Sequence, residues 1–244
     1  MNILVLGGSG NTGQCILNKL LWDNHNVKAV VRKNSSLPNF IKSHEKLTII
    51  EGNVLGFTEQ EIILLIQDCD VIVSSLGHNL TFKGMFCNPR LLVTQTLKKL
   101  SIAIQNKKTN NTVKILLMNS SGVQNRDLNE YISFSQKCII LLLKMLLPPH
   151  LDNEKAANFL RAEITSNNSK IEWVIIRPDS LIDENTASQY KAYLSPIRSA
   201  IFDAGKTSRI NVAHFMSELI SNTKLWEEWK GKMPVLYNKH YTKL

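Results

Sequence analysis

Short apolar runs of strand length alternate along the chain with segments whose apolar residues recur at helical spacing. The strand-like runs are continuous rather than alternately polar and apolar, which is typical of strands covered on both faces of a parallel sheet. Strands that alternate with helices in this way predict βαβ units. The expected strands cover residues 2–6, 26–32, 47–51, 71–75, 113–118 and 171–176.

The helical segments carry recognisable end signals. Thr58 and Glu61 have the spacing of a capping box, which predicts a helix that runs to Asp68. Asn88 is suited to cap a helix in which Pro89 takes the first position and which continues to about residue 106. The other expected elements are helices over residues 14–22, 130–147, 152–162 and 212–222, with a break at Pro148 and Pro149, and a short strand at 234–237.

These elements fit one domain. The chain has 244 residues, 43% of them hydrophobic, which is enough to bury a sizeable core. The predicted fold class is α/β, a doubly wound parallel-sheet Rossmann fold over residues 1–244. The strand–helix alternation weakens in residues 178–244, which we expect to contribute a small C-terminal lobe on the substrate side. Residues 180–208 would line the substrate pocket and carry no motif that identifies the substrate.

Three glycines follow the first strand at fixed spacing and open a helix. With 11 glycines in the chain, this spacing should arise by chance only about 0.02 times. The first glycine permits a tight turn, the second lets the backbone approach a pyrophosphate, and the third lets the helix pack closely on the strand. The helix N-terminus adds free N–H groups and a positive dipole end. A turn without a ligand is the alternative to dinucleotide binding, for which the predicted residues are Gly7, Ser9, Gly10, Asn11, Thr12 and Gly13.

The end of the second strand predicts which dinucleotide binds. A domain that binds NAD has Asp or Glu at this position, to bond the ribose hydroxyls. Here the position is Arg32, followed by Lys33. An arginine binds a 2′-phosphate through charge-assisted bonds of roughly 1.5–3 kcal/mol, so the predicted cofactor is NADP. The alternative is that Arg32 is a solvated charge at a strand end.

Charge and cysteine content exclude several classes of function. The net charge is +9 and the pI about 9.4, but the basic residues are spread along the chain without a cluster or interleaved aromatic residues. We therefore expect no nucleic-acid partner, and a small phosphorylated ligand instead. The four cysteines have no short pairing, so neither a metal site nor a disulfide framework is indicated. They are predicted to be buried thiols in a reducing compartment, at positions 15, 69, 87 and 138.

The apolar segments argue for a cytoplasmic protein. Met1 leads directly into an apolar strand without a charged leader, and the longest apolar run, 138–147, is too short to span a bilayer. We expect no membrane partner. The run predicts a buried helix, or a surface helix that covers a pocket or a partner. The expected state is a monomer or homodimer, and core burial is the more typical use of the stripe Ile139, Leu142, Leu143 and Leu146.

Taken in order, the motifs resemble those of the atypical short-chain dehydrogenase/reductases, a group that includes NmrA-like proteins and flavin or biliverdin-IXβ reductases. The likeness covers roughly the first 180 residues and, more weakly, residues 209–213. Each motif falls at the carboxyl end of an expected strand, where open α/β sheets bind ligands. The matching segments are Gly7 to Gly13, Val30-Val31-Arg32, Gly52-Asn53-Val54, Ser74-Ser75-Leu76-Gly77, Ser120-Ser121-Gly122 and Arg177-Pro178-Asp179.

The resemblance implies a role for most of these residues. Asn53 stands where the family has an acid beside the adenine, and Ser120 falls in the segment of the family's active-site serine. Pro178 would lie beside the nicotinamide. The implied cofactor contacts outside the glycine loop are Arg32, Lys33, Asn53, Val54, Ser75, Leu76, Gly77, Ser120, Lys155 and Pro178.

The proton donor of the superfamily is missing. Classical members use Tyr-x-x-x-Lys on a helix, in which the lysine lowers the pKa of the tyrosine, and this chain contains no such motif. The best alignment puts Leu151 in place of the tyrosine and Lys155 in place of the lysine, which either touches the nicotinamide ribose or is a surface lysine. Candidate replacements are Tyr131, His150, and Ser120 or its neighbour Ser121, none of them compelling.

Two functions compete. The first is an NADPH-dependent reductase of a flavin-like, quinone-like or other conjugated small molecule, held under the helix of residues 138–147 and the segment after Pro178. Such an acceptor needs no protein acid, because water can protonate it after hydride transfer. The second is a non-catalytic NADP-sensing regulator of the NmrA kind, which the missing tyrosine favours. A third hypothesis is a structural subunit that has no affinity for the cofactor.

Overall fold

The computed structural model describes residues 1–33, 35–78, 89–107 and 111–239. An eight-stranded sheet forms its centre, in the order β3-β2-β1-β4-β5-β6-β10-β8. Neighbouring strands are parallel, except that β8 and β10 are antiparallel. The order of the first six is that of a doubly wound dinucleotide-binding sheet, so the predicted fold class is confirmed. The strands are β1 Asn2–Leu6, β2 Asn26–Val31, β3 Leu47–Glu51, β4 Val71–Ser74, β5 Val113–Met118, β6 Ile171–Pro178, β8 Tyr190–Tyr193 and β10 Val235–Asn238.

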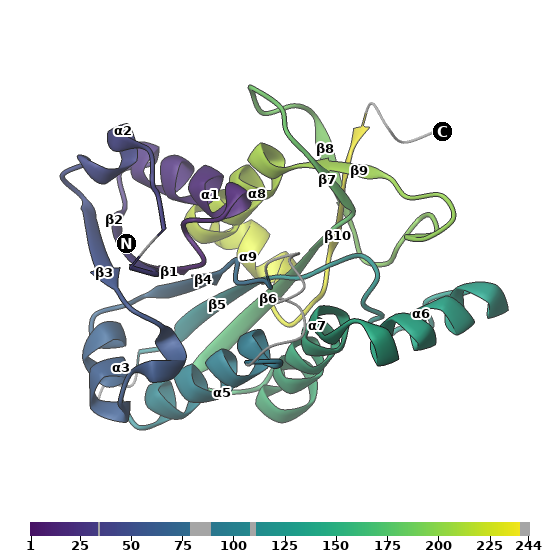
Figure 1. Cartoon of the computed structure of the whole chain (residues 1–244), viewed down its shortest axis with the longest axis horizontal. Helices are drawn as coiled ribbons and strands as arrows, with labels where there is room; N and C mark the ends of the chain where they lie inside the picture. The colour runs from purple at the N-terminus through teal and green to yellow at the C-terminus, as the bar shows by residue number, and fades with distance from the viewer. Residues whose placement is uncertain (34, 79–88, 108–110, 240–244) are drawn as a thin grey trace.

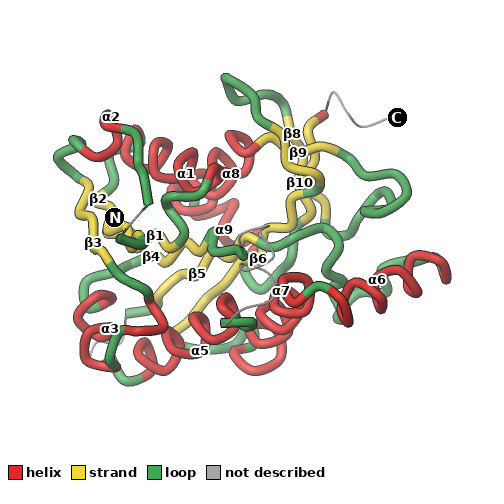
Figure 2. Tube along the Cα trace, viewed as in Figure 1, coloured by secondary structure: helices red, strands yellow, loops and turns green. Residues whose placement is uncertain are grey.

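Helices cover both faces of the sheet (Figures 1 and 2). One face carries α1 (Asn11–Trp22), α8 (Arg209–Ser221) and α9 (Thr223–Trp229). The other carries α3 (Glu59–Ile66), α5 (Leu92–Gln105) and α7 (Pro148–Asn158). Successive residues of one strand enter different cores, so the strands are apolar throughout, as their continuous hydrophobic pattern predicts.

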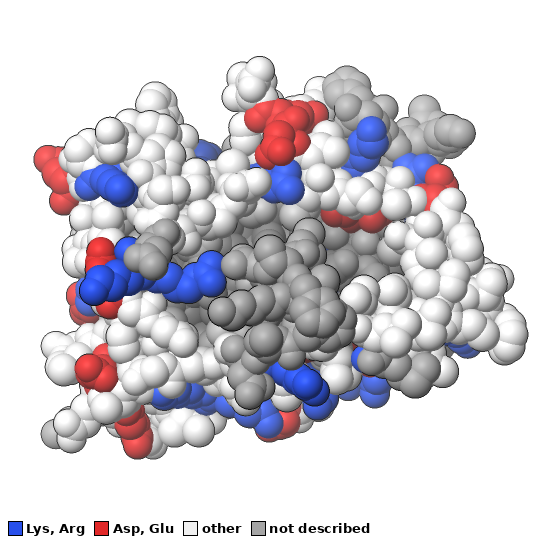
Figure 3. Space-filling view, viewed as in Figure 1, with Lys and Arg blue, Asp and Glu red and all other residues white. Residues whose placement is uncertain are grey.

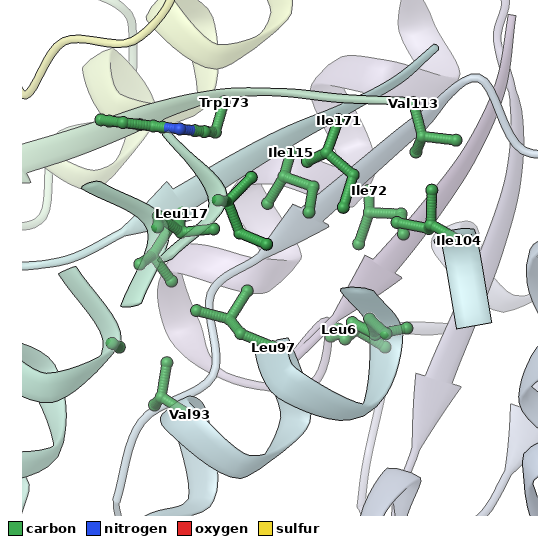
Figure 4. Packing of buried hydrophobic residues seen from close by; sticks show 14 of the residues in the cluster. Leu6, Ile72, Val93, Leu97, Ile104, Val113, Ile115, Leu117, Ile171 and Trp173 are labelled. Atoms are coloured by element: carbon green, nitrogen blue, oxygen red, sulfur yellow. The ribbon is translucent and has the colours of Figure 1, made fainter. Parts of the chain in front are cut away.

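Helix α5 shows how the spacing of apolar residues builds one of these cores. Its buried residues Val93, Leu97, Leu100 and Ile104 recur at intervals of four and three and so share one helix face. In Figure 4, Val93, Leu97 and Ile104 lie beside strand residues that include Ile115. The helix is thereby held along the sheet with its first turn near the carboxyl ends of the strands.

The first turn of α5 differs from the prediction. The helix begins at Leu92 rather than Pro89, and Asn88 lies outside the described residues. The fully buried carboxylate of Asp152, on α7, accepts hydrogen bonds from the backbone N–H groups of Val93 (2.8 Å) and Thr94 (2.9 Å). A distant aspartate therefore caps this helix, which no local sequence signal announces.

The helix pair before β6 is also shifted. Helix α6 spans Phe134–Leu146 and begins after Ser133, whose hydroxyl accepts from the N–H of Gln136 (3.2 Å). Helix α7 already starts at Pro148, because proline is well suited to a first helical position, and continues into a π-helical turn, η2 (Phe159–Ile164). The predicted break at the two prolines is confirmed, but the predicted helix start at residue 130 is wrong.

Helix α6 lies on the surface rather than in the core (Figure 1). Leu142 and Leu146 are 50% and 57% exposed, so the expectation of a buried stripe is wrong and the surface-helix alternative holds. Cys138 is exposed and Cys15 half-buried, whereas Cys69 is buried as expected. Cys87 lies outside the described residues. No helix in the described ranges has the length and apolar character needed to cross a membrane.

The C-terminal region contributes more to the fold than the predicted lobe. Strand β10 pairs with β6, β8 extends the sheet further, and α8 packs against α1. A separate two-stranded sheet is formed by β7 (Ser180–Ile182) and β9 (Lys206–Ser208). The sequence predicted α8 and β10 with shifted ends. It did not predict the three short strands β7, β8 and β9 or helix α9, because they lack a long periodic pattern.

Candidate functional site

A cleft of about 340 Å³ lies at the carboxyl ends of the central strands. Residues that follow β1, β2, β3 and β4 line it, together with Met118 at the end of β5, as expected for a doubly wound sheet. The structure brings together here most of the predicted cofactor residues: Gly7, Ser9, Gly10, Asn11, Thr12, Gly13, Arg32, Asn53, Val54, Ser75, Leu76 and Gly77.

The geometry of the glycine loop explains its spacing. Gly7 has φ +79°, and a Cβ on it would lie 2.7 Å from the carbonyl carbon of Ser75. A Cβ on Gly13 would overlap the backbone of Gly7, so only glycine lets α1 approach β1 this closely. The N–H of Gly10 donates to the carbonyl oxygen of Gly7 (3.1 Å) and closes the turn.

The N-terminus of α1 suits an anionic ligand. Its N-cap residue is Gly10, no side chain caps the helix, and its first turn contains no acidic residue. The first N–H groups of the helix therefore can donate hydrogen bonds to a ligand in the cleft. The helix dipole favours a negative charge at the same place. No carboxylate occurs among the described residues that line this cleft. The donor set thus fits the phosphates of a dinucleotide.

Two further edges of the cleft come from β2 and β3. Arg32 is exposed and lines the cleft, and within the described part of the chain its guanidinium forms no ion pair. Lys33 is exposed but does not line the cleft. Asn53 caps the 3-10 turn η1 (Val54–Gly56) by accepting from the N–H of Leu55 (3.2 Å). Figure 3 shows Lys and Arg side chains in a row on this face of the molecule.

Sequence reasoning missed His78, which follows the end of β4 and lines the cleft. Its Nε2 lies 2.9 Å from the Asp152 carboxylate that also caps α5. One buried aspartate therefore connects α7, the start of α5 and the rim of the cleft. The sequence signal that could have identified His78 is its position directly after the Ser74–Gly77 motif. The other lining residues that were not predicted are Val30, Gly52, Leu92, Met118, Leu181 and Arg209.

A second cavity of about 220 Å³ lies beyond the end of β5. Ser121 and Gly122 line it on the strand side, Ile140 of α6 lines it as well, and residues 196–200 close it. This is the place expected for a substrate, under the helix of residues 138–147 and against the segment after Pro178.

Ser120 and His150 both lie beside Gly122, but neither lines the cofactor cleft or the second cavity, so the cofactor contact expected of Ser120 is not found. Both are half-buried, and a Cβ on Gly122 would lie 3.6 Å from Ser120 Oγ and 3.7 Å from His150 Cε1. Ser120 Oγ accepts from the N–H of Gly122 (3.2 Å). Burial lowers the pKa of His150 from its ordinary value, Glu154 opposes this shift, and Lys144 adds to it. This shift favours the neutral imidazole.

Lys155 and Tyr131 lie elsewhere. Lys155 is exposed on α7 and lines a groove against α5 with Gln95 and Lys98, outside the cofactor cleft. This placement matches the surface-lysine alternative. The side chain of Tyr131 is 92% exposed at the rim of the second cavity.

The Arg177-Pro178 motif does not make the cofactor contact that was expected of it. Arg177 is fully buried and forms an ion pair with Glu130 (2.7 Å), so it points into the protein. Pro178 does not line the cleft, and its carbonyl oxygen accepts from the N–H of Ser121 (3.0 Å). Burial raises the pKa of the next residue, Asp179, while hydrogen bonds from Gly205 N–H and Ser121 Oγ oppose the rise. Asp179 thereby links Ser121, which lines the second cavity, to Gly205.

Comparison with known proteins agrees with this geometry. Residues 7–223 match the NAD(P)H-binding family. The chain belongs to this family. The expected kinship with atypical short-chain dehydrogenase/reductases is confirmed. The comparison with curated proteins finds no match.

Several solved structures share the fold of this NAD(P)H-binding protein. A short-chain dehydrogenase/reductase from Veillonella parvula, in complex with NADP, is 17% identical, with 99% of this chain and 96% of that chain covered and a TM-score of 0.68. An anaerobilin reductase from Escherichia coli O157:H7 is 15% identical over 100% of both chains, with a TM-score of 0.67. An oxidoreductase from Lactococcus lactis is 17% identical over 98% of this chain and 91% of that chain, with a TM-score of 0.67.

Proposed function

We propose that this protein is an NADPH-dependent reductase of a flavin-like, quinone-like or other conjugated small molecule. The observation that carries the proposal is the cleft itself, in which an uncapped helix N-terminus and Arg32 meet without an opposing carboxylate. The structural neighbours support it, since one is a complex with NADP and another is named as a reductase.

The residues of the cleft would divide the cofactor between them. The glycine loop and the N-terminus of α1 bind the pyrophosphate, and Arg32 binds the 2′-phosphate by charge-assisted hydrogen bonds. Gly52 and Asn53 adjoin the adenine, and Ser75 to Gly77 follow the ribose. When bound, the cofactor supplies a hydride.

The second cavity would hold the acceptor. Ser121, Gly122 and Ile140 would hold a flat ligand beside the end of β5, and Gly122 adjoins Ser120 and His150. Ser120 Oγ can donate a hydrogen bond to a carbonyl of the acceptor, and His150 can supply a proton. A conjugated acceptor that water protonates explains how the reaction proceeds without the tyrosine of the superfamily.

Two measurements test the proposal. We expect the wild-type protein to bind NADP more tightly than NAD, and Arg32→Asp to reverse this preference, because a carboxylate repels the 2′-phosphate. Equal affinity of the wild type for both cofactors would contradict the choice of NADP. The decay of NADPH absorbance with flavins and quinones measures turnover. Tight NADPH binding without turnover on any acceptor would instead support the NADP-sensing regulator.

A further inference from the structure

Arg209 is a second arginine in the cofactor cleft. It is the first residue of α8, it lines the cleft together with Leu181, and its side chain is 19% exposed. It is separated by 177 positions from Arg32, so its presence in the same cleft is a product of the fold. The only charged side chains other than histidine among the described residues lining this cleft are these two arginines.

The position of α8 places Arg209 across the glycine loop from Arg32. Helix α8 packs against α1 and against β6. Arg32 follows β2, which lies on the opposite side of β1 from β4, β5 and β6. The two arginines therefore line the cleft from two separate elements that both adjoin α1, and Figure 1 shows α8 beside α1 and away from β2 and β3.

The electrostatics of α1 support this placement. Burial raises the pKa of the Cys15 thiol on α1, Asp183 raises it further, and Arg209 lowers it. Such an influence requires that the charge of Arg209 lies near the first turns of α1, where the uncapped N–H groups are.

The present partner of Arg209 is a solvent-exposed carboxylate. Its Nη1 lies 2.9 Å from the Asp183 carboxylate, whose side chain is 77% exposed. Because the carboxylate of this pair is largely solvated, a ligand phosphate can replace it as the partner of the guanidinium.

We propose that Arg209 binds the pyrophosphate of the dinucleotide, on the nicotinamide side of the glycine loop, while Arg32 binds the 2′-phosphate. This assignment rests on the proposed function. NAD and NADP share the pyrophosphate, whereas only NADP carries the 2′-phosphate. Arg209 thus determines affinity for both cofactors, and Arg32 determines the choice between them.

The test measures dissociation constants by calorimetry for NADP, NAD and adenosine 2′-monophosphate, which has no pyrophosphate. Arg209→Gln should weaken NADP and NAD by a similar factor, about tenfold to a hundredfold, and leave the monophosphate unchanged. Arg32→Gln should weaken NADP and the monophosphate and leave NAD unchanged. Asp183→Asn should keep or increase the affinity for both dinucleotides, because it removes a competitor.

The controls separate this assignment from a loss of structure. Arg161→Gln removes an arginine that pairs with Asp127 and lies outside the cofactor cleft, and it should bind all three ligands like the wild type. Unfolding curves check that Arg209→Gln is folded. If Arg209→Gln is folded and binds NADP and NAD as tightly as the wild type, the assignment of Arg209 is overturned and the proposed function is not affected. A wild-type protein that binds neither dinucleotide overturns the proposed function and the assignment together.

Discussion

Glu130 and Arg177 form a buried, two-pronged ion pair. The Glu130 oxygens accept from Nη2 (2.7 Å) and Nη1 (3.1 Å) of Arg177. The other guanidinium donors reach the backbone carbonyls of Val123, Leu194 and Met233. The pair joins the end of β6 to the segments before α6, after β8 and before β10, and so fixes one wall of the second cavity.

Removing the charge of Glu130 should destabilise the protein strongly. In Glu130→Gln the guanidinium stays buried without a counter-ion, and breaking a buried pair in this way costs about 3–5 kcal/mol. Urea unfolding measures the loss. The control is Glu163→Gln, whose side chain is 59% exposed and whose partner Lys98 is 49% exposed, so its effect should stay below about 1 kcal/mol. Equal effects of the two substitutions would contradict this interpretation.

An alanine at Gly13 should damage the loop, whereas one at Gly56 should not. A Cβ on Gly13 overlaps the backbone of Gly7, which cannot move without displacing the turn, while a Cβ on Gly56 has nothing within 4 Å. We expect Gly13→Ala to lose about 1–3 kcal/mol of stability and at least about tenfold in NADP affinity. Urea unfolding and calorimetry check both values. Unchanged NADP binding in Gly13→Ala would show that the turn is not the cofactor cradle.

The proposed oxidation of NADPH should become faster toward acid pH if His150 is the proton donor. Burial lowers the pKa of His150, so the charged form becomes abundant only below the ordinary value of about 6.5. The rate should therefore rise as pH falls, with an apparent pKa below about 6.5, and this limb should vanish in His150→Gln. His44→Gln, which alters a histidine outside both cavities, is the control. A limb that persists in His150→Gln would assign the proton to water.

The same shift affects stability in a defined direction. Because the pKa of His150 is lower in the folded protein, the unfolded chain binds more protons below about pH 6.5. The free energy of unfolding should therefore fall as pH falls through this range, and His150→Gln should show a smaller fall. A steeper fall in the variant would contradict the lowered pKa.

The sequence by itself determined the six parallel strands β1 to β6, the short strand β10 and the glycine loop. These features depend on information within a few residues, because a continuous apolar run marks a strand covered on both faces and because glycine spacing limits backbone geometry directly. Arg32 belongs to this group, since it directly follows β2 and is therefore placed by the strand itself.

Only the tertiary structure decided which polar side chains meet. Asp152 caps a helix 58 residues earlier in the chain, Glu130 holds Arg177 away from the cleft, and Arg209 enters it from the far end of the sequence. Lys155, by contrast, is directed to the surface. A local sequence pattern predicts periodicity and turns. A buried charge needs a partner that is close in space, and the packing of the helices on the sheet determines which residue that is.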